Sequence, residues 1–296
     1  MKRYLVLLVA ALLLGCQATT KLARQGLGEV VGQEKAESIM NVAEAARKGF
    51  EDLTPQEEYY IGRAVAANIL AKYPVLERTS LTEYVTKVGQ TAAWASDRPE
   101  TFGGYHFLVL GTDDPLAYSA PGGFVFISKG LMRTMKDEEE LAGVLAHEVA
   151  HVSARHGLSA IKQSRLMDAF SVLVAEGKKY SSEEVAKLAN IYEGALDDIV
   201  TMLVEKGYSR TQETEADQLG ATYATRAGYD PLGLISFLGT LKAAEGKTME
   251  IGLVKSHPNP GERKTDLQGY LQKQGLSGKT EPARTARFSS MKSLLG

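Results

Sequence analysis

The residues with the clearest chemical potential lie at 147–151, where the sequence reads His-Glu-Val-Ala-His. In a helix, residues four positions apart share a face, so the imidazoles of His147 and His151 can reach one metal ion. Glu148 lies beside that face, where its carboxylate can take a proton from a water molecule whose pKa zinc lowers to about 7. The pattern therefore predicts a zinc hydrolase with Glu148 as general base. The alternative is an ordinary buried helix whose two histidines make hydrogen bonds.

A catalytic zinc site needs a third protein ligand, and two segments offer one. His156 follows His151 by five residues, which on a continuing helix turns its ring about 140° away, so His156 is expected to be a structural or a surface residue. Glu213 and Asp217 lie four residues apart in a second predicted helix and share a face, while Glu215 points elsewhere. If the second helix crosses the first, Glu213 reaches the metal, and Asp217 orients a ligand histidine or donates a proton. The competing interpretation is an acidic first turn favoured by the helix dipole.

Helices and one small sheet must position these residues. Thr54 followed by Pro55 and Glu57 is typical of a capped helix start, and Ser209 predicts another start before the acidic segment. Strands are predicted at 105–110, 116–119 and 124–127, in an antiparallel or mixed sheet, with His106 as a structural residue of the first strand. Helices are predicted at about 54–73, 81–95, 137–156, 209–227, 230–244 and 257–274, with a further helical insert at 158–206.

The first sixteen residues are typical of a bacterial lipoprotein leader. Lys2 and Arg3 precede an apolar run at 4–14, which is shorter than the about 20 residues that span a bilayer. The run ends Leu-Leu-Gly-Cys, and Cys16 is the only cysteine, so we expect cleavage before Cys16 and a lipid on its thiol. The alternative is a secretory leader with an incidental cysteine. Because no later apolar run is long enough to cross a membrane, the mature chain is predicted to be anchored to one.

Composition and charge limit the partners. Apolar residues make up 44% of the sequence and the formal net charge is −2, which is ordinary for a globular protein and offers no basic surface for nucleic acid. Gln17 stands where an aspartate would favour inner-membrane retention of enteric lipoproteins, which favours the outer membrane. The predicted organisation is a leader at 1–15, a lipidated tether with a helix at 16–50, a catalytic domain at 51–275 and a flexible basic tail at 276–296.

Several motifs, in order along the chain, resemble one family: the HExxH zinc metallopeptidases that include the CAAX prenyl protease, HtpX and BepA. This chain has Leu116-Ala117-Tyr118 where the family often has Asn-Ala before an aromatic residue. The sequence also predicts neither the transmembrane helices of HtpX-type members nor the helical repeats of BepA. The resemblance covers about 50–272 and rests on segments at 53–57, 117–132, 147–156, 207–217, 228–231 and 257–263.

The resemblance implies one zinc ion per chain, bound by His147, His151 and Glu213. It implies that Glu148 is the catalytic base and that Asp217 is a supporting acid or proton donor. It also implies the fold class: α+β and mostly helical, a zincin-like (gluzincin) domain with a small β-sheet beside the HExxH helix.

Further expectations concern the substrate side of the site. The resemblance implies that an edge strand receives an extended peptide through main-chain hydrogen bonds, and we assign that edge to 124–127, with Phe124, Val125 and Phe126 as substrate-binding residues. His257 is a candidate fourth zinc ligand whose binding would keep the enzyme latent, or else a histidine with an ordinary hydrogen bond. Arg263 is a candidate for stabilising the tetrahedral oxyanion.

The functional expectation is a zinc metalloendopeptidase of the bacterial envelope, lipid-anchored and facing the periplasm, that cuts misfolded or stalled envelope proteins. The alternative is a chaperone-like factor that acts with the outer-membrane assembly machinery and whose proteolysis is latent or secondary; apolar residues of the 158–206 insert would then hold unfolded chains. A purely structural zinc protein is disfavoured, because Glu148 would have no role in a closed site.

Overall fold

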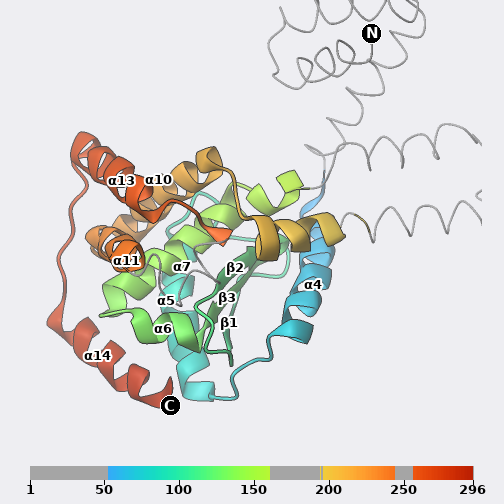
Figure 1. Cartoon of the computed structure of the whole chain (residues 1–296), viewed down its shortest axis with the longest axis horizontal. Coiled ribbons are helices and arrows are strands. Elements are labelled where there is room, and N and C mark those ends of the chain that lie inside the picture. The colour runs from blue at the N-terminus through green and yellow to red at the C-terminus, as the bar shows by residue number, and fades with distance from the viewer. Residues whose placement is uncertain (1–52, 161–193, 195, 244–255, 296) are drawn as a thin grey trace, which may run out of the picture. The chain divides into compact units, whose positions relative to one another are not determined.

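A computed structural model of the chain describes residues 53–160, 194, 196–243 and 256–295. The predicted leader, the lipid site at Cys16, the tether and most of the helical insert lie outside these residues. The described part consists of helices around one three-stranded sheet (Figure 1), so the predicted mostly helical α+β fold is confirmed. None of the helices in the described ranges combines the length and the apolar character that crossing a bilayer requires.

Two helices begin at the capping residues that the sequence predicts. At α4, Thr54 Oγ1 accepts a hydrogen bond from the backbone N–H of Glu57, whose carboxylate accepts one from Thr54 N–H in return. Ser209 and Gln212 form the same reciprocal cap at the start of α10. The helices are α4 (Pro55–Lys72), α5 (Thr79–Trp94), α6 (Lys129–Thr134), α7 (Glu138–Ser153), α10 (Arg210–Arg226), α11 (Leu232–Ala243), α13 (Pro260–Gln274) and α14 (Pro282–Lys292), with short turns η1 (Pro121–Gly123), η2 (His156–Ala160), η3 (Met202–Lys206) and η5 (Ser293–Leu295).

The sheet places its third strand in the middle. β3 (Phe124–Ser128) pairs in parallel with β1 (His106–Leu110) and antiparallel with β2 (Ala117–Ala120), giving the order β1-β3-β2. The prediction that 124–127 forms the edge that receives substrate is therefore wrong. Neighbouring strands flank β3 on both sides, and Phe124, Val125 and Phe126 are only 9%, 1% and 0% exposed. An unbroken apolar run of this kind is typical of a strand buried on both faces.

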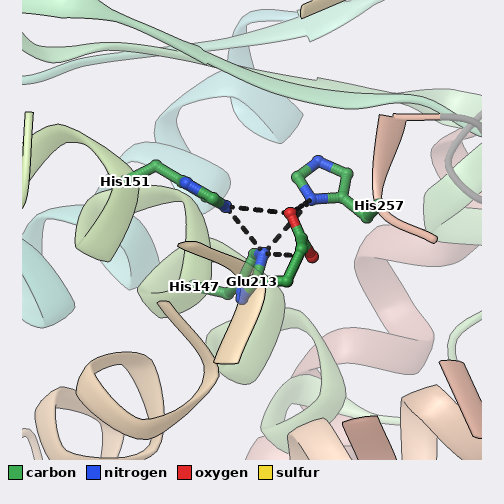
Figure 2. A group of neighbouring side chains, drawn as sticks. All are labelled: His147, His151, Glu213 and His257. Carbon is green, nitrogen blue, oxygen red and sulfur yellow. Dashed lines mark hydrogen bonds and ion pairs between the residues drawn. The ribbon is translucent and has the colours of Figure 1, made fainter. Parts of the chain in front are cut away.

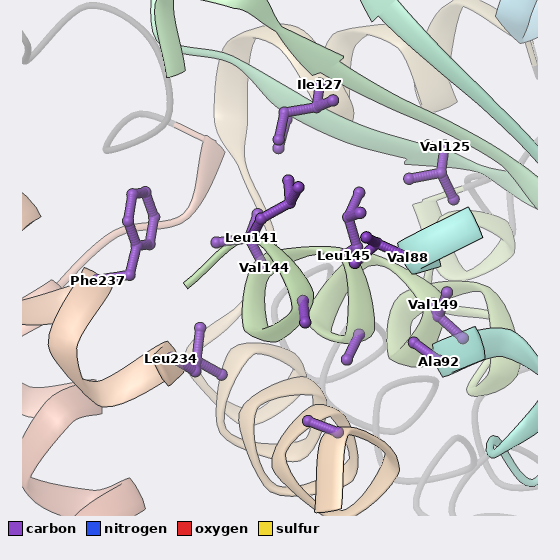
Figure 3. Close-up of a cluster of buried hydrophobic side chains, with 14 of the residues drawn as sticks. Val88, Ala92, Val125, Ile127, Leu141, Val144, Leu145, Val149, Leu234 and Phe237 are labelled. Atoms are coloured by element: carbon purple, nitrogen blue, oxygen red, sulfur yellow. The ribbon is translucent and has the colours of Figure 1, made fainter. Parts of the chain in front are cut away.

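The two faces of the sheet pack against different helices. Phe124 and Phe126 join a core with Val65 and Ile69 of α4, whereas Val125 and Ile127 of the same strand pack toward α7 and α5. Figure 3 shows the second core, with Val125 and Ile127 above α7 and with residues of α5 and α11 on its flanks. Helix α7 is consequently enclosed, and all its residues except Ser153 are buried.

The chain's last described helix packs against the start of α7. The predicted flexible tail instead contains α14, whose Phe288 is fully buried. Arg287 of α14 hydrogen-bonds the carboxylate of Glu138, and Arg284 donates to Glu139 at 3.1 Å. The prediction of a flexible tail is wrong for this part of the chain. Phe288 and Met291 lie three positions apart among polar and small residues, a pattern too short to predict a docked helix by itself.

Candidate metal centre

Helices α7 and α10 cross closely enough to bring their polar residues together. The crossing lies at Gly220, where an added Cβ would stand 2.9 Å from the Cα of His147. A side chain at this position would push the two helices apart, so the glycine sets their separation. Glu213 and Asp217, two turns and one turn before Gly220 on α10, then face His147.

Four side chains place donor atoms around one point (Figure 2). Nε2 of His147 lies 3.1 Å from Nε2 of His151 and 3.7 Å from Oε2 of Glu213, and Nε2 of His151 lies 3.5 Å from Oε1 of Glu213. Nδ1 of His257 lies 2.9 Å from Oε1 of Glu213 and 3.3 Å from Nε2 of His147. Zinc bonds of 2.0–2.1 Å in a tetrahedron separate neighbouring donors by about 3.4 Å. The spacing therefore fits a zinc ion, and the set contains the three predicted ligands and the candidate fourth.

Glu148 has a carboxylate that no described residue satisfies. The side chain is buried, and neither of its oxygens accepts a hydrogen bond within the described part of the chain. Oε1 lies 3.4 Å from Nε2 of His257, at ion-pair distance. A buried carboxylate without hydrogen bonds destabilises the fold. Its presence here therefore points to a functional hydrogen-bond donor, such as a reacting water.

Arg263 links two of the three carboxylates of α10, those of Glu213 and Asp217. Its Nε and Nη2 donate to Asp217 at 2.8 and 2.6 Å, and Nη1 lies 2.7 Å from Oε2 of Glu213. Oδ1 of Asp217 lies 3.0 Å from Nδ1 of His147, although the angle is poor for a hydrogen bond. Burial would raise the pKa of Asp217, but the guanidinium of Arg263 holds that pKa at about 2. At Glu213, burial would also raise the pKa, but Arg263 and His257 hold it well below its usual range. Glu213 and Asp217 are therefore both ionised at neutral pH.

His151 is held in the form that binds metals. Burial lowers its pKa well below the usual value, so the imidazole is neutral. The ring of Tyr208 stacks on it with centroids 3.7 Å apart and planes 14° apart, and the Tyr208 hydroxyl lies 3.4 Å from the carbonyl oxygen of Ser119, to which it donates. Tyr208 thus connects the metal centre to β2. Its contact with the ligand was not predicted from the sequence, because a tyrosine before a helix cap carries no signal of its own.

His156 occupies a place that the spacing argument did not foresee. Helix α7 ends at Ser153, and Arg155 adopts a left-handed backbone with φ 59°, so the chain reverses. His156 therefore returns to His151, and their Nδ1 atoms lie 2.9 Å apart. The predicted direction of its ring is wrong, because the helix does not continue to residue 156. His106 instead stacks on Phe124, with ring centroids 5.0 Å apart, and is not part of the donor group.

An apolar cleft meets the polar side of the centre. Its walls come from α7 and α11, and it borders both the HExxH helix and the donor His257. Its volume is only about 10 Å³, enough for about one water molecule, so it holds no side chain in this structure. The lining residues are Val144, Leu234, Phe237, Leu238 and Leu241, together with His147, Glu148, His257 and Arg263.

The fold and this centre define a family. Residues 79–271, well over half of the chain, match the sequence profile of Peptidase family M48, and the chain belongs to that family. The resemblance inferred from the motifs is thereby confirmed. The matched range includes the four donors and Glu148, so the family assignment and the geometry concern the same part of the molecule.

Curated relatives share this region at modest identity. The chain is 24% identical over 257 residues to the "Beta-barrel assembly-enhancing protease" of Escherichia coli, covering 84% of this chain and 50% of that protein. It is 28% identical over 231 residues to the "Mitochondrial metalloendopeptidase OMA1" of Schizosaccharomyces pombe, covering 76% of this chain and 64% of that one. It is 30% identical over 166 residues to the "Metalloprotease YcaL" of Escherichia coli, covering 56% and 62%. The chain thus spans about half the length of the first of these relatives.

Proposed function

We propose that this chain is a zinc-dependent metalloendopeptidase of the bacterial cell envelope with a gluzincin-type centre. The observation that carries the proposal is the tetrahedral spacing of four buried donors beside the unsatisfied carboxylate of Glu148. Membership of Peptidase family M48 and relatives named as proteases or metalloendopeptidases support the same reaction class.

The proposed chemistry divides the work among residues of two helices. His147, His151 and Glu213 would hold one zinc ion, which when bound supplies the Lewis acidity that makes water a nucleophile at neutral pH. Glu148 takes the proton of the attacking water and passes it to the leaving amine. Asp217, fixed by Arg263, keeps the Nδ1 side of His147 next to a negative charge, so that its Nε2 stays free to bind.

His257 gives the proposal a resting state. Its Nδ1 stands at the fourth corner of the donor group, which a water and a substrate would need during catalysis. Its carbonyl oxygen lies 3.4 Å from Nη1 of Arg263, so the His257 segment and the α10 carboxylates share one arginine. We infer that the enzyme is latent while His257 fills this corner, and that a change displacing His257 admits substrate. Arg263 would then be close enough to the vacated corner to stabilise a tetrahedral oxyanion.

The substrate side of the proposal follows from the corrected sheet. β2, at one margin of the described sheet, lies beside the centre, because Tyr208 bonds to Ser119 of β2 and stacks on His151. All four residues of β2 are buried, so an extended peptide could add to this edge by main-chain hydrogen bonds only after the segments that cover β2 are displaced. Unfolded polypeptides present such an extended main chain.

The location and substrates remain part of the proposal. Cys16, as a lipidation site, would anchor the protein to a membrane facing the periplasm, and Gln17 favours the outer membrane. The name of the Escherichia coli relative refers to β-barrel assembly, which supports misfolded or stalled outer-membrane proteins as substrates and the assembly machinery as a partner. The alternative is a chaperone-like assembly factor in which proteolysis is secondary.

Cleavage of casein by the purified mature chain, from residue 17 onward with zinc added, tests the proposal. Wild type, Glu148→Gln and His257→Ala are compared at equal zinc occupancy. We expect Glu148→Gln to be inactive and His257→Ala to cut at least as fast as wild type, with the ratio of the last two measuring latency. Stoichiometric zinc without cleavage by any of the three would favour the chaperone alternative, and cleavage by Glu148→Gln would contradict the assigned base.

A further inference from the structure

The second ligand histidine has a partner on the side turned away from the donors. Nε2 of His151 faces the donor group, while its Nδ1 lies 2.9 Å from Nδ1 of His156. The other nitrogen of His156, Nε2, lies 3.2 Å from Oε2 of Glu215. Both imidazoles are buried, whereas the Glu215 side chain is 53% exposed. The three residues therefore form a chain of contacts from the metal centre to the surface.

Only one placement of protons satisfies this chain while His151 binds a metal. A ligand Nε2 must offer a lone pair, so the ring hydrogen of His151 lies on Nδ1 and is donated to His156. Nδ1 of His156 then accepts, and its own hydrogen lies on Nε2, which donates to the acceptor-only carboxylate of Glu215. In the reverse arrangement, the hydrogen of His151 would point into the donor group and a lone pair of His156 would face the carboxylate. Glu215 disfavours that arrangement by charge.

The fold holds this chain of contacts in place from both ends. The left-handed turn at Arg155 brings His156 back against α7, and the Ser159 hydroxyl bonds to the His156 carbonyl oxygen at 2.7 Å. Gln212 of α10 donates to that same hydroxyl at 2.6 Å. Since α10 carries Gln212, the ligand Glu213 and Glu215, one helix supplies a metal donor and also ties down the turn that backs His151.

We propose that His156 and Glu215 are positioning residues that fix the tautomer and ring orientation of His151 for zinc. The proposal rests on the proposed metal centre and adds to it two residues that bind no metal themselves. It makes the two histidine ligands unequal. His147 lies directly against the carboxylate of Asp217, whereas His151 reaches its carboxylate through a neutral imidazole. Partners of this kind change metal affinity or activity by about 10–100-fold in other proteins.

The proposed role of the His151–His156–Glu215 chain of contacts, here called the relay, is tested by the zinc affinity of the full mature chain. That affinity is measured by competition with a chromophoric chelator. Glu215→Ala is compared with Glu262→Ala, which removes the same charge from a side chain that is 60% exposed on α13. We expect Glu215→Ala to weaken zinc binding by about 10-fold or more and Glu262→Ala to leave it unchanged. Because Glu215 is half exposed, its removal leaves the core intact, and the melting temperature of the zinc-free chain serves as the check.

A second comparison separates positioning from packing at His156. Glutamine can accept from His151 through Oε1 and donate to Glu215 through Nε2, whereas leucine fills the space without either bond. We expect His156→Gln to retain most of the zinc affinity and the visible absorption spectrum of the Co²⁺-substituted protein, and His156→Leu to lose affinity and shift that spectrum. Equal zinc affinity in Glu215→Ala and wild type, or equal behaviour of the two His156 variants, would overturn the relay. A wild-type chain that bound no zinc would overturn the proposed function as well.

Discussion

Two buried glutamates, one near each end of α7, have very different surroundings. At the first turn, Glu138 accepts hydrogen bonds from Tyr84 at 2.8 Å, from Tyr229 at 3.3 Å and from Arg287. Three turns later on the same helix, Glu148 is equally buried but accepts no hydrogen bond from any residue in the described ranges.

This difference distinguishes a carboxylate that stabilises the fold from one that serves a reaction. Partners from α5, the loop before α11, and α14 converge on the first turn, where the negative charge also suits the helix N-terminus. Around Glu148, the nearby groups are donors to a metal and an apolar cleft. Burial is common to both glutamates, and the lack of hydrogen bonds to Glu148 is what distinguishes the functional end of the helix.

The largest expected effect comes from Glu148→Gln. The amide cannot take a proton from water, so we expect the rate of casein cleavage to fall by about 10²–10⁴-fold while zinc content is retained. Thermal unfolding should show the variant to be at least as stable as wild type, because the change removes a buried charge that accepts no hydrogen bond. A clear loss of stability would mean that Glu148 has a structural partner and would remove the contrast between the two ends.

Phe288→Ala tests the packing at the first turn of α7, the end where Glu138 is fully hydrogen-bonded. Phe288 is the fully buried anchor of α14, and truncation of such a side chain costs about 3–5 kcal/mol of unfolding free energy. Denaturant unfolding would measure this loss, with Leu294→Ala as a control at a side chain that is 38% exposed. We expect the folded variant to keep its zinc. Equal stabilities of the two variants would show that α14 adds little to the fold.

Glu138→Gln makes the same chemical change at the first turn of α7 as Glu148→Gln makes three turns later. It weakens the charge-assisted bonds from Arg287 and leaves part of their donors unmet, so a loss of about 1–3 kcal/mol in unfolding free energy is expected. Cleavage by the folded fraction, measured at low temperature, should stay near wild type. Loss of activity without loss of stability would place the first turn in the catalytic machinery and contradict the assignment.

The smallest effect on stability is expected at a surface ion pair that lies at neither end of α7. Arg210 and Glu262 are 2.8 Å apart but mostly exposed, so solvent screens their attraction. Arg210→Ala should change the unfolding free energy by less than about 1 kcal/mol, measured by the same denaturant unfolding. A larger loss would indicate that α10 and α13 depend on this surface contact for their packing, and the position of Glu213 would then need a different explanation.

The sequence was informative where local patterns determine the outcome. The capped starts of α4 and α10, the helical spacing of His147 and His151, and the pairing of Glu213 with Asp217 on one face all depend on neighbouring residues. The structure brings these residues into one donor group, with His257 from a segment whose approach was inferred only by resemblance.

The predictions failed where the outcome depends on distant parts of the chain. Whether β3 is an edge strand or the central strand depends on β1, an earlier segment of the chain that pairs with β3 in parallel. The direction of His156 depends on a left-handed turn at Arg155, a residue type that rarely marks a helix end. The docking of α14 depends on carboxylates almost 150 residues away, at the start of α7.

X-ray diffraction on both sides of the zinc absorption edge, from crystals of the mature chain grown with equimolar zinc, tests the central claim most directly. The account predicts one anomalous peak about 2.0–2.2 Å from Nε2 of His147, Nε2 of His151 and a carboxylate oxygen of Glu213. Density for a water or for His257 at the fourth corner would distinguish the open from the latent form. Zinc bound elsewhere, with these donors left empty, would contradict the claim that the unsatisfied end of α7 is a metal centre.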